Sequence, residues 1–340
     1  MVVVVIPQRL GDLLFPMRDP GFGPLLAELS EPDAGRSADN FVSNEDSFGR
    51  VCDDLAGRDG VYLGVGPDQN FSYIARAWPS LAFIVDFRRR NALVHLLHKG
   101  LMALAPDRVG YLARLTARVP GPMPANPSAD DLVAAFATPA LDRARLEATV
   151  AEVLESLRPL GVLGEGEASA IASIASRLAG PGMNARFLAL PMYPTFGDLI
   201  RARTRAGKPA HFLADEASYQ AVRERQMGDR ILPVVGDFAG PKALGAIGAL
   251  LARAGRKVAV AYVSDVEFFL LRSGKFPAYV ANLGRLPWAD GAVIVRTSTR
   301  EIAHPERVAG DSSTTIVRPV APFLERARAG EIRSDADLFR

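Results

Sequence analysis

Two histidines and two cations share one face of the helix predicted at 88–104. With about 100° between successive residues, this face carries Arg88, Asn91, His95, His98 and Lys99. An imidazole titrates near neutrality, so His98 is a candidate acid or base. The other four are candidates for binding substrate, with Arg88 and Lys99 able to hold an anionic group. The alternative is a solvated helix face, and no metal site is expected, because this histidine spacing alone is a weak ligand pattern.

Carboxylates follow three predicted strands. The apolar runs at 81–85, 231–235 and 258–263 are followed by Asp86, by Asp237, and by Asp265 and Glu267. Ligands bind open α/β sheets at the carboxyl ends of strands, so these carboxylates are candidates for a site. If Asp265 and Glu267 met in a partly desolvated cleft, one would have a raised pKa and could act as a base. The alternative is a capping aspartate beside a surface glutamate.

A glycine-containing turn follows the strand predicted at 61–65. Its glycines allow close approach of a ligand to the backbone, and Asp86, about 20 residues later, is placed to accept hydrogen bonds from ribose hydroxyls. The third glycine of the dinucleotide fingerprint is absent, which suits S-adenosylmethionine better than a pyrophosphate. The candidate cofactor-binding residues are Gly64, Gly66, Asp68, Asn70 and Asp86. The alternative is a structural turn with a capping aspartate.

Two further candidates lie outside these segments. Asn44 and Glu45 belong to a polar cluster that could fold over the mouth of the site and bind substrate, although a surface turn explains them equally well. Arg296 ends the last predicted strand, at 292–295, and is a second candidate for binding an anion. The mouth of the site is expected near 61–70 and 86–99.

Strand, helix, strand and helix alternate between residues 61 and 104, which predicts a doubly wound, mostly parallel α/β sheet of the Rossmann type. A proline-rich stretch at 119–127 interrupts the pattern. Thr138-Pro139 reads as a helix start, and further helical periodicity follows. Arg186–Leu190 could be a strand. The predicted organisation is an irregular segment 1–60 covering the cleft, a core of 61–118 and 183–320, a helical insertion or cap 119–182, and a tail 321–340.

Composition limits the class of protein. The 340 residues are 49% apolar and 23% charged, with a net charge of +2, as in an ordinary globular protein. This balance gives no basis for a nucleic-acid or membrane partner. Cys52 is the only cysteine, so no intramolecular disulfide forms. The N-terminus lacks the features of a signal peptide, and a cytoplasmic protein is expected.

The residues also carry a resemblance. The chain resembles a largely uncharacterised bacterial family with a methyltransferase-like Rossmann fold. The resemblance rests on Ser43–Phe48 (SNEDSF), Val61–Phe71 (VYLGVGPDQNF), Ala82–Asn91 (AFIVDFRRRN), Val234–Lys242 (VVGDFAGPK) and Tyr262–Glu267 (YVSDVE). It spans most of residues 40–300 and implies a fold similar to class I S-adenosylmethionine enzymes. Asp265 and His98 depart from the family pattern, which has an asparagine and a tyrosine there, and both add a titratable group.

Three functions remain open at this point. The first is methyl transfer from S-adenosylmethionine to a small molecule, with Asp265 or His98 deprotonating the acceptor. The second is an elimination or cyclisation without the methyl donor, such as aziridine-type ring closure with loss of sulfate in antibiotic biosynthesis. There a base among Asp265, Glu267 and His98 would work with a cationic anion site. The third is a non-catalytic partner subunit. The substrate is expected to be a small molecule, and a homodimer or a heteromeric partner is compatible with each reading.

Overall fold

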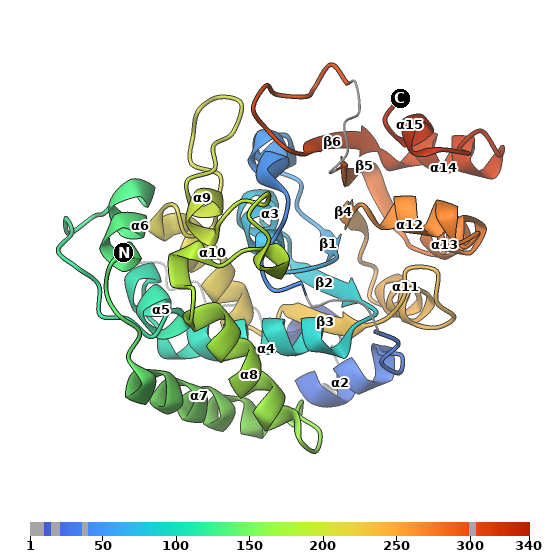
Figure 1. Cartoon of the computed structure of the whole chain (residues 1–340). Coiled ribbons are helices and arrows are strands. Elements are labelled where there is room, and N and C mark those ends of the chain that lie inside the picture. The colour runs from blue at the N-terminus through green and yellow to red at the C-terminus, as the bar shows by residue number, and fades with distance from the viewer. Residues whose placement is uncertain (1–9, 15–20, 36–39, 299–303) are drawn as a thin grey trace, which may run out of the picture.

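A six-stranded sheet forms the centre of the protein, for which a computed structural model describes residues 10–14, 21–35, 40–298 and 304–340. The strand order is β3-β2-β1-β4-β5-β6 (Figure 1). The strands are β1 (Val61–Gly64), β2 (Leu81–Asp86), β3 (Ile231–Val235), β4 (Val258–Ser264), β5 (Trp288–Ser298) and β6 (Thr314–Pro319). Strands β1 to β5 run parallel, and β6 is antiparallel to β5. An α/β fold with a mostly parallel sheet is thereby confirmed.

The central strands are buried almost end to end, which is why they read as continuous apolar runs in the sequence. The strand order reverses at β1, because the chain builds outward to β2 and β3 on one side and to β4 and β5 on the other. Ligands bind open α/β sheets beyond the carboxyl ends of the strands at such a reversal. The residues that follow β1 and β4 are therefore the first candidates for a site.

Helices cover both faces of the sheet. They are α1 (Leu10–Leu14), α2 (Phe22–Leu29), α3 (Gln69–Ala77), α4 (Arg89–Leu104), α5 (Arg108–Leu115), α6 (Ala129–Ala137), α7 (Arg143–Leu157), α8 (Glu167–Ala179), α9 (Phe196–Ile200), α10 (Glu216–Met227), α11 (Ala243–Arg253), α12 (Val266–Arg272), α13 (Phe276–Leu283), α14 (Val320–Arg328) and α15 (Asp335–Leu338), with 3-10 segments η1 (Asp46–Leu55), η2 (Arg158–Leu160), η3 (Gly182–Asn184) and η4 (Phe187–Ala189). Figure 1 shows α3, α4 and α10 on one side of the sheet and α11 to α14 on the other.

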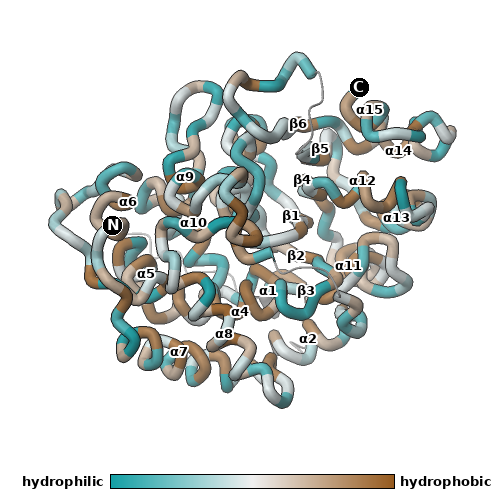
Figure 2. Tube along the Cα trace, in the orientation of Figure 1, coloured by the Kyte–Doolittle hydropathy of each residue, from teal (hydrophilic) through white to brown (hydrophobic). Residues whose placement is uncertain are grey.

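Helices α7 and α8, from the predicted insertion, pack on the outer side of α4. Apolar and polar residues alternate along both helices (Figure 2), and their buried side chains include Val153, Leu157, Ile171 and Ile174. These residues belong to the same contiguous apolar core as the sheet. Helix α4 is thus enclosed between the sheet on one side and α7 and α8 on the other, and this enclosure decides the environment of its polar side chains.

Two local predictions are wrong. Arg186–Leu190 is not a strand, because Leu188 and Ala189 have positive φ angles of 51° and 55° that no extended strand tolerates. Thr138 does not start a helix but ends α6; the next helix begins at Arg143, where the Asp142 side chain accepts a hydrogen bond from the Arg145 N–H. Among the described residues, no helix combines the length and apolar character needed to cross a bilayer.

Candidate functional site

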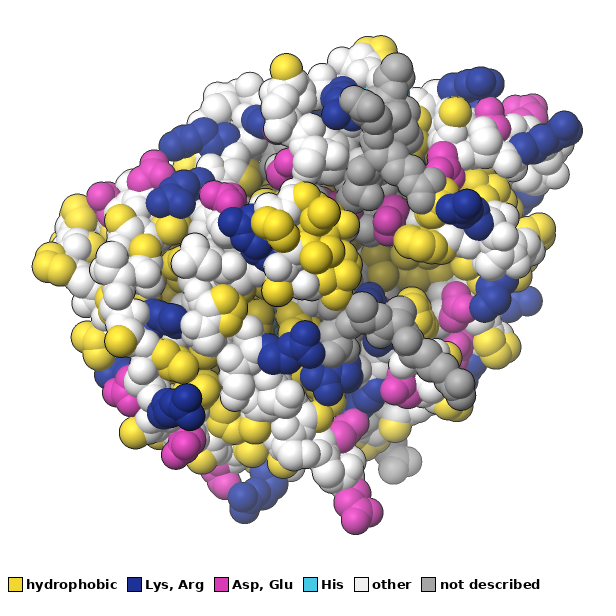
Figure 3. Space-filling view, viewed as in Figure 1, with side chains coloured by type: hydrophobic (Ala, Val, Ile, Leu, Met, Phe, Trp, Pro, Cys, Tyr) yellow, Lys and Arg dark blue, Asp and Glu magenta, His cyan; other side chains and the backbone are white. Residues whose placement is uncertain are grey.

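The carboxyl edge of the sheet gathers polar side chains from segments far apart in the sequence. Figure 3 shows that this face is hollowed right of centre, with an apolar floor. A small pocket, open to solvent on one side, lies beside the ends of β4 and β5, and its interior has room for little more than a water molecule. Its lining residues are Ser264, Asp265, Glu267, Phe268, Arg296, Thr297, Ser298, Asp335, Leu338 and Phe339. Two of the candidate carboxylates and the candidate Arg296 therefore meet at one pocket.

Glu45 lies directly behind this pocket and is 1% exposed. Its Oε1 accepts a hydrogen bond from the Ser264 hydroxyl at 2.5 Å, and its Oε2 accepts from Gln69 Nε2 at 2.8 Å and from the Thr297 hydroxyl at 2.7 Å. Burial raises the pKa of Glu45, while these hydrogen bonds act in the opposite direction. Every one of these donors is neutral, so Glu45 is a buried carboxyl group without a cationic partner among the described residues.

Four separate elements hold this cluster together. Glu45 immediately precedes η1, Gln69 is the first residue of α3, Ser264 ends β4 and Thr297 lies near the end of β5. Gln69 is itself held, because its Oε1 accepts a hydrogen bond from the Ser43 hydroxyl and its Nε2 also donates to the Tyr262 hydroxyl at 3.0 Å. The sequence reasoning included Glu45 but missed its partners, although polar residues ending apolar strands were a usable signal.

Glu267 and Arg296 form a buried ion pair, and each side chain is 2% exposed. Arg296 donates through Nε to one carboxylate oxygen at 2.6 Å and through Nη2 to the other at 3.0 Å. The Tyr279 hydroxyl donates to the same carboxylate at 3.0 Å. The two residues were predicted to be a free base and a free anion site, but the structure pairs them with each other.

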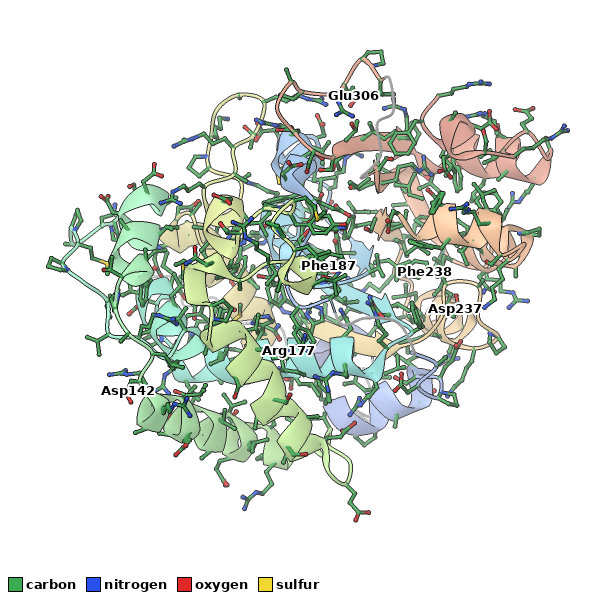
Figure 4. The ribbon with its side chains drawn as sticks, viewed as in Figure 1. Asp142, Arg177, Phe187, Asp237, Phe238 and Glu306 are labelled. Atoms are coloured by element: carbon green, nitrogen blue, oxygen red, sulfur yellow. The ribbon has the colours of Figure 1, made fainter. Side chains whose placement is uncertain are left out.

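Asp86 is likewise bound by an arginine. Its Oδ1 accepts hydrogen bonds from the Arg88 backbone N–H at 3.0 Å and from Arg88 Nε at 2.8 Å, and its Oδ2 accepts from Arg88 Nη2 at 2.7 Å. The carboxylate expected to hold a ribose and the cation expected to hold a substrate anion are therefore bound to one another. Asp237, which follows β3 (Figure 4), pairs with Lys275 at 3.1 Å.

The turn after β1 is filled by its own side chains. Asn70 Nδ2 donates to the carbonyl oxygens of Val65 at 2.8 Å and Pro67 at 2.7 Å, and its Oδ1 accepts from the Tyr62 hydroxyl at 2.9 Å. His95 Nε2 lies 2.8 Å from the carbonyl oxygen of Gly66. The absence of a side chain at position 64 makes room for Asn70 rather than for a ligand.

The substitution Gly64→Ala tests this packing. A Cβ atom there would lie 1.9 Å from Asn70 Oδ1 and 2.6 Å from the Tyr62 ring, so one of these side chains must move. We expect the free energy of unfolding to fall by about 1–3 kcal/mol, as for other overpacked core positions. Urea denaturation of the variant measures this. The control is Gly121→Ala, at a glycine without a positive φ angle where an added Cβ atom would lie 3.5 Å from its nearest neighbour, an ordinary contact. An effect no larger than that of the control would contradict the packing argument.

The polar face predicted for α4 is not a wall of one cleft. Asn91, His95, His98 and Lys99 are all buried, because α7, α8 and α10 cover the helix. Lys99 pairs with Asp229 at 2.6 Å, just before β3, and so lies toward the amino edge of the sheet, away from the expected mouth. The predicted grouping of Lys99 with the other site residues is therefore wrong.

His98 and Asp68 line a second, narrow pocket with room for little more than a water molecule. The other lining residues are Phe41, Val42, Leu115, Thr116, Leu178, Gly182, Ala185 and Phe196. His98 Nδ1 lies 2.7 Å from the Tyr111 hydroxyl, and its Nε2 has no hydrogen-bond partner among the described residues. Burial lowers the pKa of His98 to about 3 and raises that of Asp68 to about 7. His98 is neutral at physiological pH, contrary to the expectation that it titrates there.

The carboxyl ends of β2 and β3 are also covered by the chain itself. Glu31 accepts hydrogen bonds from the backbone N–H groups of Asp237 at 3.2 Å and Ala243 at 2.8 Å, and the Ala34 N–H donates to the carbonyl oxygen of Phe87 at 3.2 Å. A nucleoside bound beyond these strands would need the same space and the same groups. With Asp86 also engaged, the residues present do not fit S-adenosylmethionine.

Comparison with known families gives one match. The family described as Domain of unknown function (DUF7790) matches residues 40–120 and 191–339, more than half of the chain. The chain belongs to this family. Nothing among the curated proteins matches the sequence. The matched residues include the Glu45 cluster and both ion pairs but not residues 121–190, which contain α6 to α8, and the family description states no activity.

Proposed function

We propose that this member of the DUF7790 family is an enzyme that transfers protons to and from a small polar molecule at the solvent-open mouth of the pocket beside the ends of β4 and β5. The proposal rests on the environment of Glu45. This residue is buried at the reversal of the strand order, and it lacks the cationic partner that Asp86, Asp237 and Glu267 each have. Carboxyl groups whose pKa is raised by burial are frequent at functional sites.

The base chemistry follows from the environment of Glu45. Desolvation raises the pKa of Glu45 above the usual glutamate value, which makes the ionised form a stronger proton acceptor than an exposed glutamate. The hydroxyl of Ser264 links this carboxylate to the pocket, and Asp265 lines the same pocket as a second carboxylate. Proton transfer between substrate and Glu45 can therefore pass through the Ser264 hydroxyl, without the Glu267–Arg296 ion pair taking part.

Methyl transfer is the second candidate. It is favoured by the strand order, which is compatible with a methyltransferase-like Rossmann sheet, and by the acidic residue at the end of β2. Against it stand the Asp86–Arg88 hydrogen bonds and the residues of segment 31–35 that cover β2 and β3. Calorimetry separates the two candidates: we expect no binding of S-adenosylmethionine or its demethylated product at millimolar concentration, and a saturable binding curve would restore methyl transfer.

Turnover of an unknown substrate can be followed by mass spectrometry of a metabolite extract incubated with the protein. We expect masses that change with the wild-type protein and that change at least about a hundredfold more slowly with Glu45→Gln, the usual size of a general-base effect. The matched control is Glu155→Gln on the exposed surface of α7. Equal conversion by Glu45→Gln and the wild type would contradict the proposal.

A further inference from the structure

Ser264 has an unusual backbone. Its φ angle is 52°, in the left-handed region that residues other than glycine rarely adopt. The described non-glycine residues that share this feature are Trp78, Ala117, Leu188, Ala189, Asp229 and Ser264, and only Ser264 joins the carboxyl end of a strand to a following helix. A strained serine at a strand-to-helix turn is the geometry in which hydrolases present a nucleophilic hydroxyl. Such strain persists only where the surrounding structure imposes it, and it gathers at active sites.

The hydroxyl of Ser264 also has a base in contact. It donates a hydrogen bond of 2.5 Å to Glu45 Oε1. The other oxygen of that carboxylate is fixed by Gln69 and Thr297, so the base is oriented by its own partners. A nucleophile, a base within hydrogen-bond reach and groups that orient the base are the three parts that nucleophilic catalysis requires.

Exposure distinguishes Ser264 from its neighbours in the cluster. Glu45 and Gln69 are buried and do not line the pocket at the ends of β4 and β5. Thr297 lines this pocket but is 2% exposed, whereas Ser264 lines it and is partly exposed. A substrate at the mouth of this pocket would therefore contact Ser264, whose proton Glu45 is placed to receive.

We propose that Ser264 is a nucleophile, activated by Glu45, that accepts an acyl group from a small ester or thioester. This inference rests on the proposed function of Glu45 as a base. Ser264 Oγ bonds to the carbonyl carbon while its proton passes to Glu45. The bond from that carbon to the leaving oxygen or sulfur then breaks, and Glu45 returns the proton to the departing alcohol or thiol. Water, or a second acceptor, attacks the acyl-serine, gives its proton to Glu45, and Ser264 recovers it as the acyl group leaves.

A fluorophosphonate probe tests this step without knowledge of the substrate. The serine oxygen bonds to phosphorus, fluoride leaves, and the proton passes to Glu45 and then to solvent, so the protein gains the mass of the probe less that of HF. We expect one modification in the intact protein, mapped to Ser264 by peptide analysis. Ser264→Ala should remove it, and Glu45→Gln should slow it at least about a hundredfold. Ser273→Ala, at the exposed end of α12, should leave the labelling rate unchanged.

Circular dichroism and urea denaturation establish that each variant is folded before labelling. No label on Ser264 of the folded wild-type protein, or a label that forms equally fast in Glu45→Gln, would overturn the inference. The metabolite experiment separates the two proposals. If Ser264 is not labelled but Glu45→Gln still stops substrate conversion, the nucleophile is wrong and the proton-transfer function stands. If Glu45→Gln has no effect in either experiment, both are wrong.

Discussion

The variant Glu267→Gln is expected to lose about 3–5 kcal/mol in free energy of unfolding, the cost of removing one partner of a buried ion pair. Arg296 would keep its charge inside the protein, where both side chains are 2% exposed. Glutamine can still accept hydrogen bonds from Arg296 and Tyr279, but it supplies no compensating charge. Urea denaturation with linear extrapolation measures the loss.

The matched control is Glu155→Gln, which removes a carboxylate from the exposed pair with Arg158. Surface pairs of this kind contribute about 0–1 kcal/mol, so the control should change stability little. The double variant Glu267→Leu, Arg296→Met should recover much of the loss, because it leaves no unpaired charge. A loss below about 1 kcal/mol in Glu267→Gln would show that Arg296 does not depend on Glu267. Such a result would support the prediction from sequence that Arg296 binds an anion.

The positions of the strands were predictable from sequence for a simple physical reason. A parallel strand buried on both faces must be apolar throughout, and the runs at 61–65, 81–85, 231–235 and 258–263 are so. The polar residues that follow such runs necessarily lie at one edge of the sheet. Asp86, Asp237 and Asp265 were therefore correctly expected at the ends of the strands.

The pairing of these side chains could not be predicted, because it depends on contacts between distant segments. Glu45 meets Ser264 across 219 residues and Thr297 across 252 residues, and no periodicity in the sequence records such a contact. The prediction for helix α4 was wrong for a related reason. Its polar face was expected to be accessible, but neighbouring helices pack on α4 and His98 is buried, which lowers the pKa of the imidazole instead of leaving it near neutrality.

Asp68→Asn is expected to stabilise the protein, and to do so more at pH 8 than at pH 5. Burial raises the pKa of Asp68 to about 7 in the folded state, against about 3.9 in the unfolded chain. The unfolded state then ionises first, so the wild-type protein loses stability as the pH rises from the unfolded value through the folded one. Linkage gives a change of about 2–3 kcal/mol between pH 5 and pH 8. Asparagine does not titrate and removes this dependence.

The surroundings of Asp68 add no other pH-dependent change in stability to this measurement. Asp68 lies at the start of α3, but its carboxylate accepts no capping hydrogen bond from the helix. The substitution by asparagine therefore removes no capping interaction. Among the neighbouring titratable groups, His98 and Tyr111 are neutral throughout this pH range, since burial lowers the pKa of the first to about 3 and raises that of the second well above its usual value. The difference in free energy of unfolding between Asp68→Asn and the wild type is measured by urea denaturation at both pH values. Asp59→Asn on the surface is the control, with a change within about 0.5 kcal/mol at each pH.

A difference that is the same at pH 5 and pH 8 would mean that Asp68 does not titrate between them. Its carboxyl would then be held ionised by a partner that the narrow pocket admits, such as a water molecule shared with the free Nε2 of His98. The expected pH dependence would instead identify Asp68 as a buried acid that is only partly ionised at neutral pH. Its ionisation would then oppose folding, so the narrow pocket lined by Asp68 and His98 would favour a neutral group at this position.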